Sequence, residues 1–183
     1  MTFSAVLDTN VLYPFSLRDT LLRLAGLELY TPLWSARILE EMTRNLVEHR
    51  ITEEQAARIE TAMREAFEEA EVDAAEIDRL EPAMTNDEKD RHVLAAAVAA
   101  DSELIVTFDL DDFPPEAYEP VGVETIHPDE FLLDLHDLNP DAVRAALEQQ
   151  AADLHPPWQL DELLRALTTA GVPRFTDAIR AGA

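Results

Sequence analysis

Short apolar segments alternate with helical patterns over most of this chain, and this alternation limits the fold more than any other feature. The segments expected to be strands are residues 3–8, 27–30, 104–108 and 121–126. The segments expected to be helices are residues 17–26, 36–48, 53–70, 87–100 and 128–137. Strands that alternate with helices pair in parallel, and the helices cover the faces of the sheet. We therefore predict an α/β fold of three layers around a central parallel sheet of about five strands.

The pattern changes after Asn139-Pro140. Beyond this point the apolar residues have helical spacing, and no strand is expected. Three short helices are predicted at residues 141–153, 159–170 and 174–181, with Pro156-Pro157 and Gly171-Val172-Pro173 between them. We therefore predict two units, a catalytic α/β domain at residues 1–138 and a helical C-terminal appendage at residues 139–183.

Polar residues mark where several elements should begin. Ser35 can cap the helix that follows it. Thr52 lies three residues before a glutamine and Thr85 three residues before a glutamate. This is capping-box spacing, so a helix is expected to begin directly after each threonine. In contrast, Pro32 is expected to stop the second strand, because proline has no N–H to donate.

The chain is strongly acidic, with a net charge of −24 from 38 acidic and 14 basic residues. Residues 1–50 hold five arginines and six acids, so nearly all of the excess negative charge lies beyond them. Phosphate backbones are bound mainly by Lys and Arg, which disfavours nonspecific nucleic-acid binding by the whole surface. A nucleic-acid function would need a local patch, metal ions or a basic partner.

The absence of cysteine excludes disulfides, zinc thiolates and thiol catalysis. The longest apolar run, residues 93–100, falls far short of the roughly 20 residues that span a bilayer. The first residues lack the basic region and cleavage site of a signal peptide. We therefore expect a cytoplasmic protein with no membrane association.

Two of the expected strands end in an aspartate. Asp8 follows one apolar segment, and Asp109 follows another. In parallel sheets covered by helices, ligands bind at the edge formed by the carboxyl ends of the strands. The two carboxylates should therefore lie at the same edge, although Asp8 by itself could also be a turn residue or a helix cap.

Helical spacing adds a third acid to this edge. Asp90 falls on the apolar stripe of its helix, one turn before Val93 and Leu94, and no basic residue lies a turn away on that face. A helix that leads into a parallel strand runs antiparallel to it, so its first turn lies at the strand's carboxyl end. Asp90 is therefore expected beside Asp8 and Asp109, the alternative being an acid that only complements the helix dipole.

Glu41 and Asp112 could complete a group of four or five carboxylates. Glu41 lies nearer to the apolar stripe of its helix than Glu40 does. Carboxylates in one pocket repel one another, and oxygen donors without cysteine favour Mg²⁺ or Mn²⁺ as the counter-charge. Such an ion can meet a phosphate group and activate a water, so the pattern indicates phosphodiester or phosphoryl hydrolysis.

Four motifs in order resemble the PIN-domain ribonucleases, and among them the VapC-type toxins of bacterial type II toxin–antitoxin pairs. The motifs are "VLDTNVL", "WSARILEEMTRNL", "DEKDRHVLAAAVAA" and "IVTFDLDDFP". The resemblance covers residues 3–115, with the fold continuing to about residue 137, and implies a Mg²⁺- or Mn²⁺-dependent endoribonuclease. The C-terminal helices resemble an extra region found on a subset of such proteins.

The resemblance also implies a role for each acid. Asp8 and Asp90 are implied metal ligands, and Glu41 is implied to orient or deprotonate the attacking water. The further acid is Asp109 or Asp112. Related segments often read Thr-x-Asn-x-x-Asp-Phe, whereas this chain has "TFDLDDF", so both alternatives stay open with Asp109 slightly ahead.

Other residues and partners follow from the same resemblance. Asn10 and Thr107 are expected to support the carboxylates by hydrogen bonds, although Asn10 could instead be a turn or cap residue. RNA is the implied substrate, a basic DNA-binding antitoxin is the implied partner, and a homodimer is a further expected assembly. The near-neutral first 50 residues suggest that Arg18, Arg23 and Arg44 face the RNA.

The histidines show no ligand spacing. His49, His92 and His127 are scattered along the chain, far from one another in sequence. They are expected at the surface or at helix ends.

Two rival functions fit parts of the pattern. A Mg²⁺-dependent phosphatase of the haloacid-dehalogenase type would need a second aspartate where Asn10 stands and a catalytic lysine, and Lys89 has the wrong context. A binding module with a PIN-like fold, acting through a basic partner without significant catalysis, would suit the acidic surface. Metal-dependent RNA cleavage separates these alternatives from a ribonuclease.

Overall fold

The computed structural model describes residues 3–49 and 51–182, so Arg50, one of the five N-terminal arginines, lies outside the described residues. The sheet consists of β1 (Ser4–Leu7), β2 (Thr31–Leu33), β3 (Leu104–Val106) and β4 (Glu124–Ile126). All neighbours pair in parallel, in the order β2-β1-β3-β4. The predicted parallel α/β sheet is confirmed, with four strands in the described part of the chain rather than about five.

The second strand lies later in the sequence than predicted. Residues 27–30 form turns and bends, and β2 contains Pro32, the residue that was expected to end it. Pro32 pairs with Ala5 at the edge of the sheet. An edge strand needs ladder hydrogen bonds on one side only, so it accepts a proline. The prediction of a strand at residues 27–30 is therefore wrong.

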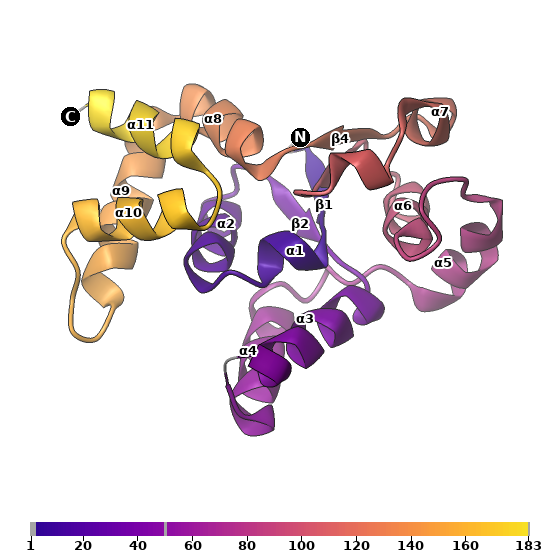
Figure 1. The fold of residues 1–183 in the computed structure, drawn as a ribbon, viewed down its shortest axis with the longest axis horizontal. Helices are drawn as coiled ribbons and strands as arrows, with labels where there is room; N and C mark the ends of the chain where they lie inside the picture. The colour runs from indigo at the N-terminus through magenta and orange to yellow at the C-terminus, as the bar shows by residue number, and fades with distance from the viewer. Residues whose placement is uncertain (1–2, 50, 183) are drawn as a thin grey trace.

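Helices make up most of the remaining structure (Figure 1). The α-helices of the described residues are α1 (Thr9–Leu12), α2 (Phe15–Gly26), α3 (Ala36–His49), α4 (Glu53–Ala66), α5 (Ala74–Leu80), α6 (Arg91–Ala99), α7 (Pro115–Tyr118), α8 (Pro128–Leu138), α9 (Pro140–Asp153), α10 (Leu160–Thr169) and α11 (Pro173–Ala181). Short 3₁₀ helices are η1 (Glu81–Ala83), η2 (Leu110–Asp112) and η3 (Glu119–Val121). The three predicted C-terminal helices are present, and no strand occurs among the described residues beyond β4.

Two of the predicted caps are confirmed. The Ile38 N–H donates to Ser35 Oγ over 3.1 Å at the start of α3. Thr52 and Gln55 form the reciprocal capping box of α4, with the Gln55 N–H donating to Thr52 Oγ1 over 3.2 Å. These hydrogen bonds join residues three apart, so short sequence patterns are enough to predict them.

Two helix predictions need correction. α6 begins at Arg91 with Asp90 as its N-cap, so the capping box expected at Thr85 does not form and residues 88–90 are a turn. α5 was not predicted, although Asp73 caps it by accepting the Glu76 N–H over 3.0 Å. α5 packs against α6, so tertiary contacts support a segment whose own helical pattern is short.

The sheet is covered on both sides. Figure 1 shows α2 on one side and α6 on the other, and α6 contacts both β1 and β3. The two central strands are fully buried at Val6, Leu7, Ile105 and Val106. This layered packing presents the carboxyl ends of β1 and β3, and the start of α6, at a common edge.

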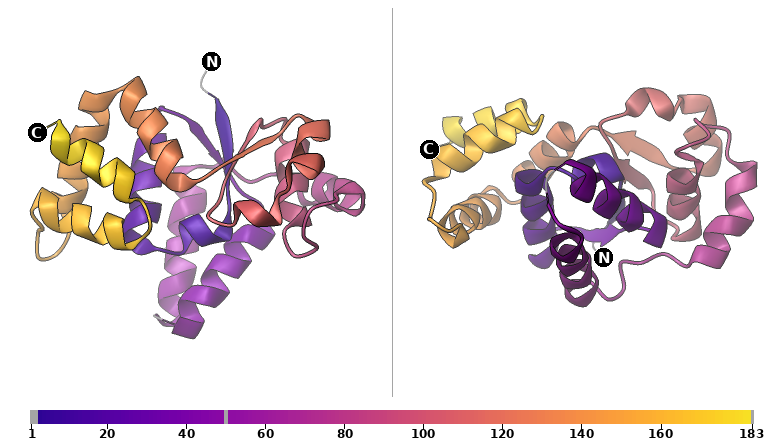
Figure 2. Two further views of the ribbon diagram at one scale, coloured as in Figure 1. Left: turned by 45° about the horizontal axis from the view of Figure 1, so that its top comes forward. Right: turned by 60° about the horizontal axis from the view of Figure 1, so that its bottom comes forward.

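The C-terminal helices gather at one end of the molecule, as both views in Figure 2 show. α9 packs against α2, while α8 packs against α9 and α11. Their apolar faces belong to the same core cluster as the sheet. None of the helices in the described part of the chain is long and apolar enough to cross a membrane.

Candidate active site

Asp8 lies where β1 ends and is only 5% exposed. It caps α1, because its Oδ1 accepts the Thr9 N–H over 2.7 Å. Burial raises the pKa of Asp8 to about 6, hydrogen bonds from Thr107 and Thr9 oppose the rise, and the charges of Asp109 and Glu41 add to it. Asp8 is therefore a helix cap and also a member of a carboxylate group.

Asn10 connects the acids at the ends of β1 and β3. Its Nδ2 lies 3.0 Å from Asp8 Oδ2, 3.0 Å from Thr107 Oγ1 and 3.1 Å from Asp109 Oδ2. Thr107 Oγ1 donates in turn to Asp8 Oδ2 over 2.7 Å. Asn10 lies inside α1, and Asp8 occupies the cap position. One amide group thus holds two carboxylates that repel each other.

The segment after β3 is tied back to α1 through its backbone. The Phe108 N–H donates to Asn10 Oδ1 over 3.1 Å. The Asp109 N–H donates to Thr107 Oγ1 over 3.1 Å. Asn10 therefore contacts this segment through both its oxygen and its nitrogen, which limits where the Asp109 carboxylate can lie.

Glu41 approaches the group from α3. Thr9 Oγ1 donates to Glu41 Oε2 over 3.2 Å. Glu41 Oε1 lies 3.5 Å from Arg37 Nε and 3.5 Å from His92 Nε2. Because Thr9 follows Asp8 directly, this hydrogen bond connects the α3 acid to the end of β1.

His92 is buried, at 1% exposure, so the expectation that it lies at the surface is wrong although it does lie at the start of α6. Burial and, to a lesser extent, the positive charge of Arg37 lower the pKa of His92 to about 4. The ring is therefore neutral at pH 7 and forms no ion pair with Glu41. Neither ring nitrogen has a hydrogen-bond partner among the described residues. His127 caps α8 and His49 ends α3, as expected.

Asp90 is half-buried at the N-cap of α6, and its side chain makes no capping hydrogen bond. Burial raises the pKa of Asp90 to about 7, and the charges of Asp8, Asp112 and Asp87 add to the rise, while Lys89 opposes it. No donor among the described residues bonds to the Asp90 carboxylate, and its charge next to other carboxylates is unfavourable for stability unless something compensates it. Such groups are concentrated at functional sites.

The two alternatives for the further acid occupy different sides of the group. Asp109 shares the Asn10 amide with Asp8, and its charge raises the pKa of Asp8. Asp112 raises the pKa of Asp90 instead, and its carbonyl oxygen accepts the Asp87 N–H over 3.1 Å. The structure thus places all five predicted acids in one electrostatically coupled group.

Whether this group suits a divalent cation depends on donor chemistry and on spacing. Within residues 3–49 and 51–182, no three His, Asp or Glu side chains are close enough together to form a metal-binding cluster. Mg²⁺, however, is commonly held by one or two carboxylates and keeps several waters. The acids offer only oxygen donors, and the charges of neighbouring acids add to the raised pKa values of Asp8 and Asp90, so the group fits Mg²⁺ or Mn²⁺ in chemistry.

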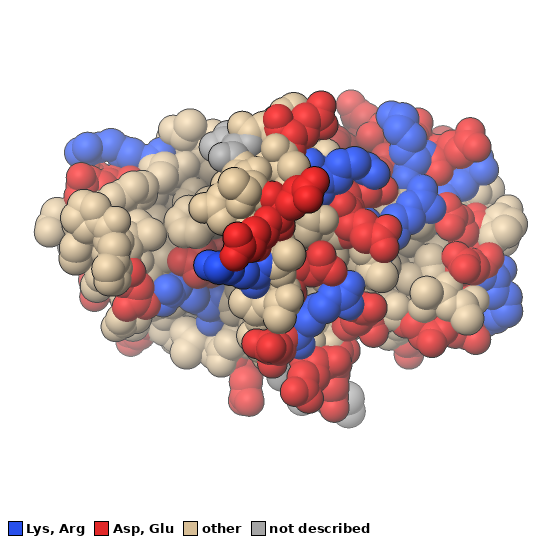
Figure 3. Space-filling model, turned by 90° about the horizontal axis from the view of Figure 1, so that it is seen from below, with Lys and Arg blue, Asp and Glu red and all other residues tan. Residues whose placement is uncertain are grey.

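The three candidate RNA-binding arginines do not form one surface. Arg18 is 5% exposed and donates to the carbonyl oxygen of Leu12 over 2.7 Å, so the expectation that it faces RNA is wrong. Arg23 lies 3.1 Å from Asp19 and 2.8 Å from Asp153. Arg44 is exposed on α3. Seen from below, the coloured basic and acidic side chains are interspersed (Figure 3).

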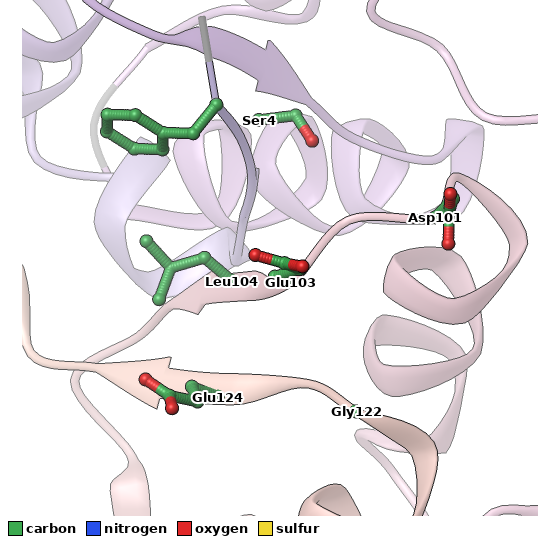
Figure 4. A pocket seen from close by; sticks show the side chains of 7 residues that line it. Ser4, Asp101, Glu103, Leu104, Gly122 and Glu124 are labelled. Carbon is green, nitrogen blue, oxygen red and sulfur yellow. The ribbon is translucent and has the colours of Figure 1, made fainter.

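A hollow of about 690 Å³ lies at the opposite edge of the sheet (Figure 4). It is lined by the amino ends of β1, β3 and β4, including Ser4, Leu104 and Glu124. Asp101 and Glu103 also line it, and both are exposed. The hollow contains none of the coupled acids, so size alone does not identify the site.

Two known protein families match parts of this chain. The PIN domain family matches residues 4–111, more than half of the chain, so the chain belongs to the PIN domain family. A second family, described as the VapC50 C-terminal domain, matches residues 128–181. The predicted resemblance to PIN-domain proteins of the VapC type with an extra C-terminal helical region is therefore confirmed.

One curated relative supports this assignment. The protein "Putative ribonuclease VapC50" of Mycobacterium tuberculosis (strain ATCC 25618 / H37Rv) is 46% identical over 99 residues, which cover 54% of this chain. The matched part spans 58% of the relative's own length. No solved structure gives a significant match.

Sequence reasoning missed four residues that touch the site. Thr9 and His92 contact Glu41, and Asp87 adds to the charge around Asp90. Thr9 follows Asp8 directly, and His92 lies two residues after Asp90. This closeness in sequence to predicted acids was the signal that could have identified both residues. Arg37 lies one helical turn before Glu41, so its contact could also have been expected.

Proposed function

We propose that this chain is a metal-dependent endoribonuclease that hydrolyses RNA phosphodiester bonds. The observation that carries the proposal is the coupled group of five acids, in which the pKa values of Asp8 and Asp90 are raised to about 6 and about 7. Such a group gathers negative charge that a divalent cation would neutralise. Membership of the PIN domain family and the similarity to a relative named as a ribonuclease support the same activity.

The proposed roles follow the positions of the acids. Asp8, Asp90 and Asp109 would hold Mg²⁺ or Mn²⁺, one or two of them directly and the rest through waters that the ion keeps, and Asp112 would act from the Asp90 side. When bound, the ion would lower the pKa of a water and stabilise the oxygens of an in-line displacement. Glu41, oriented by Thr9, would accept the proton of the attacking water, while Asn10 and Thr107 would keep the carboxylates in place.

We also propose that the protein is the toxin of a type II toxin–antitoxin pair. A basic DNA-binding antitoxin would neutralise part of the net charge of −24. A homodimer is a further assembly that we propose. RNA would approach where charge is least repulsive, and of the three candidate arginines the exposed Arg44 and the partly exposed Arg23 remain candidates for contacting it.

The predicted division into residues 1–138 and 139–183 is kept as a proposal. α8 belongs by sequence to the first unit, and it packs against α9 and α11 of the second. A proteolysis experiment that releases a stable fragment would show whether the boundary lies after or before α8.

Cleavage of a labelled RNA in the presence of Mn²⁺ or Mg²⁺ tests the proposed activity. We expect cleavage by the wild type and its loss on adding EDTA. Asp8→Asn should lose activity, whereas Asp111→Asn, an exposed acid between the two alternative site acids, should keep it. Equal activity of wild type and Asp8→Asn, or none with either metal, would favour the binding module that acts through a basic partner.

A further inference from the structure

The C-terminal helices reach the candidate active site at a glycine. Gly171 lies between α10 and α11 with a backbone φ of +105°, a conformation that residues with a side chain rarely adopt. A Cβ added to Gly171 would lie 2.8 Å from Phe108 Cε1 and 3.2 Å from Phe108 Cζ. The backbone of Gly171 is therefore packed against the ring of Phe108, which stands directly before Asp109.

The Phe108 ring has a second contact from the segment that leads into α8. His127, the N-cap of α8, meets it edge-on, with the ring centroids 5.1 Å apart. A ring held by both Gly171 and His127 has less freedom to turn aside than one held by a single neighbour. The residue that caps α8 and the loop that precedes α11 thus both contact the ring.

These two segments are joined to each other by a buried carboxylate. Asp129, 5% exposed in the first turn of α8, accepts the Phe175 N–H over 2.8 Å and the Arg174 N–H over 3.1 Å. The two N–H groups belong to the first turn of α11, so Asp129 fixes the start of that helix. The loop that carries Gly171 leads directly into this fixed turn.

From Phe108 the contacts continue into the acid group. The Phe108 N–H donates to Asn10 Oδ1, and Asn10 Nδ2 lies 3.1 Å from Asp109 Oδ2 and 3.0 Å from Asp8 Oδ2. A displacement of Phe108 would therefore alter the hydrogen bonds that keep the two carboxylates in place. The α/β unit by itself contains no glycine that packs on this ring within the described residues.

We propose that the C-terminal helical region is a positioning element for the active site, acting through the packing of Gly171 on Phe108 to orient Asn10 and Asp109. This inference rests on the proposed ribonuclease function for its activity readout. Gly171 and Phe108 are positioning residues in this account, because neither carries a group that would react with RNA.

The test compares two glycines that both have a positive φ. Gly171→Ala introduces both the unfavourable φ and the collision with Phe108. Gly122→Ala is the matched control, because Gly122 has a φ of +73° but no atom within 4 Å of an added Cβ. We expect Gly171→Ala to lower kcat at least about 10-fold with KM little changed, and Gly122→Ala to lower it less than about 2-fold.

A double variant shows whether the effect passes through Phe108. Phe108→Leu removes the ring atoms that the new Cβ would meet, so Phe108→Leu with Gly171→Ala should recover the activity of Phe108→Leu alone. This non-additivity is the signature of coupling between the two positions. A double variant as impaired as Gly171→Ala, or equal activity of the two glycine variants, would overturn the proposal.

A readout without RNA or metal separates this inference from the proposed activity. The side-chain amide of Asn10 can be followed by NMR in ¹⁵N-labelled protein. Gly171→Ala should shift its resonances, and Gly122→Ala should leave them in place. If wild type fails to cleave RNA but the Asn10 signals shift, the ribonuclease proposal fails while the positioning inference stands. If Gly171→Ala does not fold, the comparison of wild type with Phe108→Leu applies, and unchanged Asn10 signals there would overturn the inference.

Discussion

Acidic residues lie at both edges of the sheet, but only at one edge do hydrogen bonds connect them. At the carboxyl edge, Asp8 and Asp109 share the Asn10 amide. At the amino edge, Glu103 and Glu124 line a hollow, and within the described residues no hydrogen bond or ion pair reaches their carboxylates. The hollow and the organised acids thus lie at opposite ends of the same strands.

The difference between the edges lies in solvation. Exposed carboxylates, such as that of Glu103, are stabilised by water and need no partner. Burial destabilises the charged forms of Asp8 and Asp90, and neighbouring acids add to the effect, so the pKa values rise to about 6 and about 7. Perturbed groups of this kind are concentrated at functional sites, which is why the carboxyl edge carries the proposed activity.

The largest contrast between the edges should appear in catalysis. Asp8→Asn removes one charge from the coupled group, and we expect RNA cleavage to fall at least about 10²-fold. Glu103→Gln removes one charge from the amino edge and should change cleavage less than about 2-fold. Single-turnover rates with a labelled RNA and Mn²⁺ measure both, and similar losses would show that the edges do not differ in function.

A smaller loss is expected from the residue that connects the carboxylates. Asn10→Ala leaves every acid in place but removes the amide shared by Asp8 and Asp109. We expect cleavage to fall about 10–100-fold, the range typical of groups that orient metal ligands. Glu124→Gln is the control at the other edge. Wild-type rates for Asn10→Ala would contradict the role given to the amide.

The pH dependence of stability should also separate the edges. The pKa of Asp8 is raised from 3.8 to about 6 on folding, so between these values the folded chain binds more protons than the unfolded chain. The stabilising contribution of this carboxyl is present below about pH 4 and is lost as the pH rises through about 6. The loss is on the order of 3 kcal/mol.

Urea denaturation without metal measures this contribution. As the pH rises over that range, the wild type should lose stability relative to Asp8→Asn. The difference between wild type and Glu103→Gln should stay constant. A pH-independent Asp8→Asn difference would contradict the raised pKa.

The smallest effect is a gain in stability at the carboxyl edge. Asp90→Asn removes a crowded charge that has no capping hydrogen bond. At pH 8 without metal we expect the variant to be about 1–2 kcal/mol more stable than wild type, after allowance for the solvent that screens a half-buried group. Cleavage activity should be lost. Glu103→Gln should change stability by less than about 0.5 kcal/mol. A destabilised Asp90→Asn would show that the carboxylate serves the fold.

Much of the fold and the site could be predicted from short patterns. The capping box at Thr52 joins residues three apart, and the position of Asp8 follows from the apolar strand before it. The alternation of strands and helices predicts that the acids after β1 and β3 share an edge. These features depend on local hydrogen bonding and on the direction of parallel strands, which the sequence pattern records.

Tertiary packing decided the rest. Pro32 lies in a strand because β2 is an edge strand, and α5 forms where it packs against α6. Arg18 resembles a surface arginine in sequence, yet it is buried because the carbonyl oxygen of Leu12 accepts its hydrogen bond. No periodicity predicts such partners, since they depend on which segments meet after folding.

The sequence by itself thus determined the acids, their edge of the sheet and the family resemblance. Only the tertiary structure decided which acids share a donor, because Asn10 lies 97 positions from Thr107 and 99 from Asp109 along the chain. The contact of Gly171 with Phe108 likewise joins regions that are distant in sequence. Close packing brings these groups together, and the geometry of the site follows from that packing.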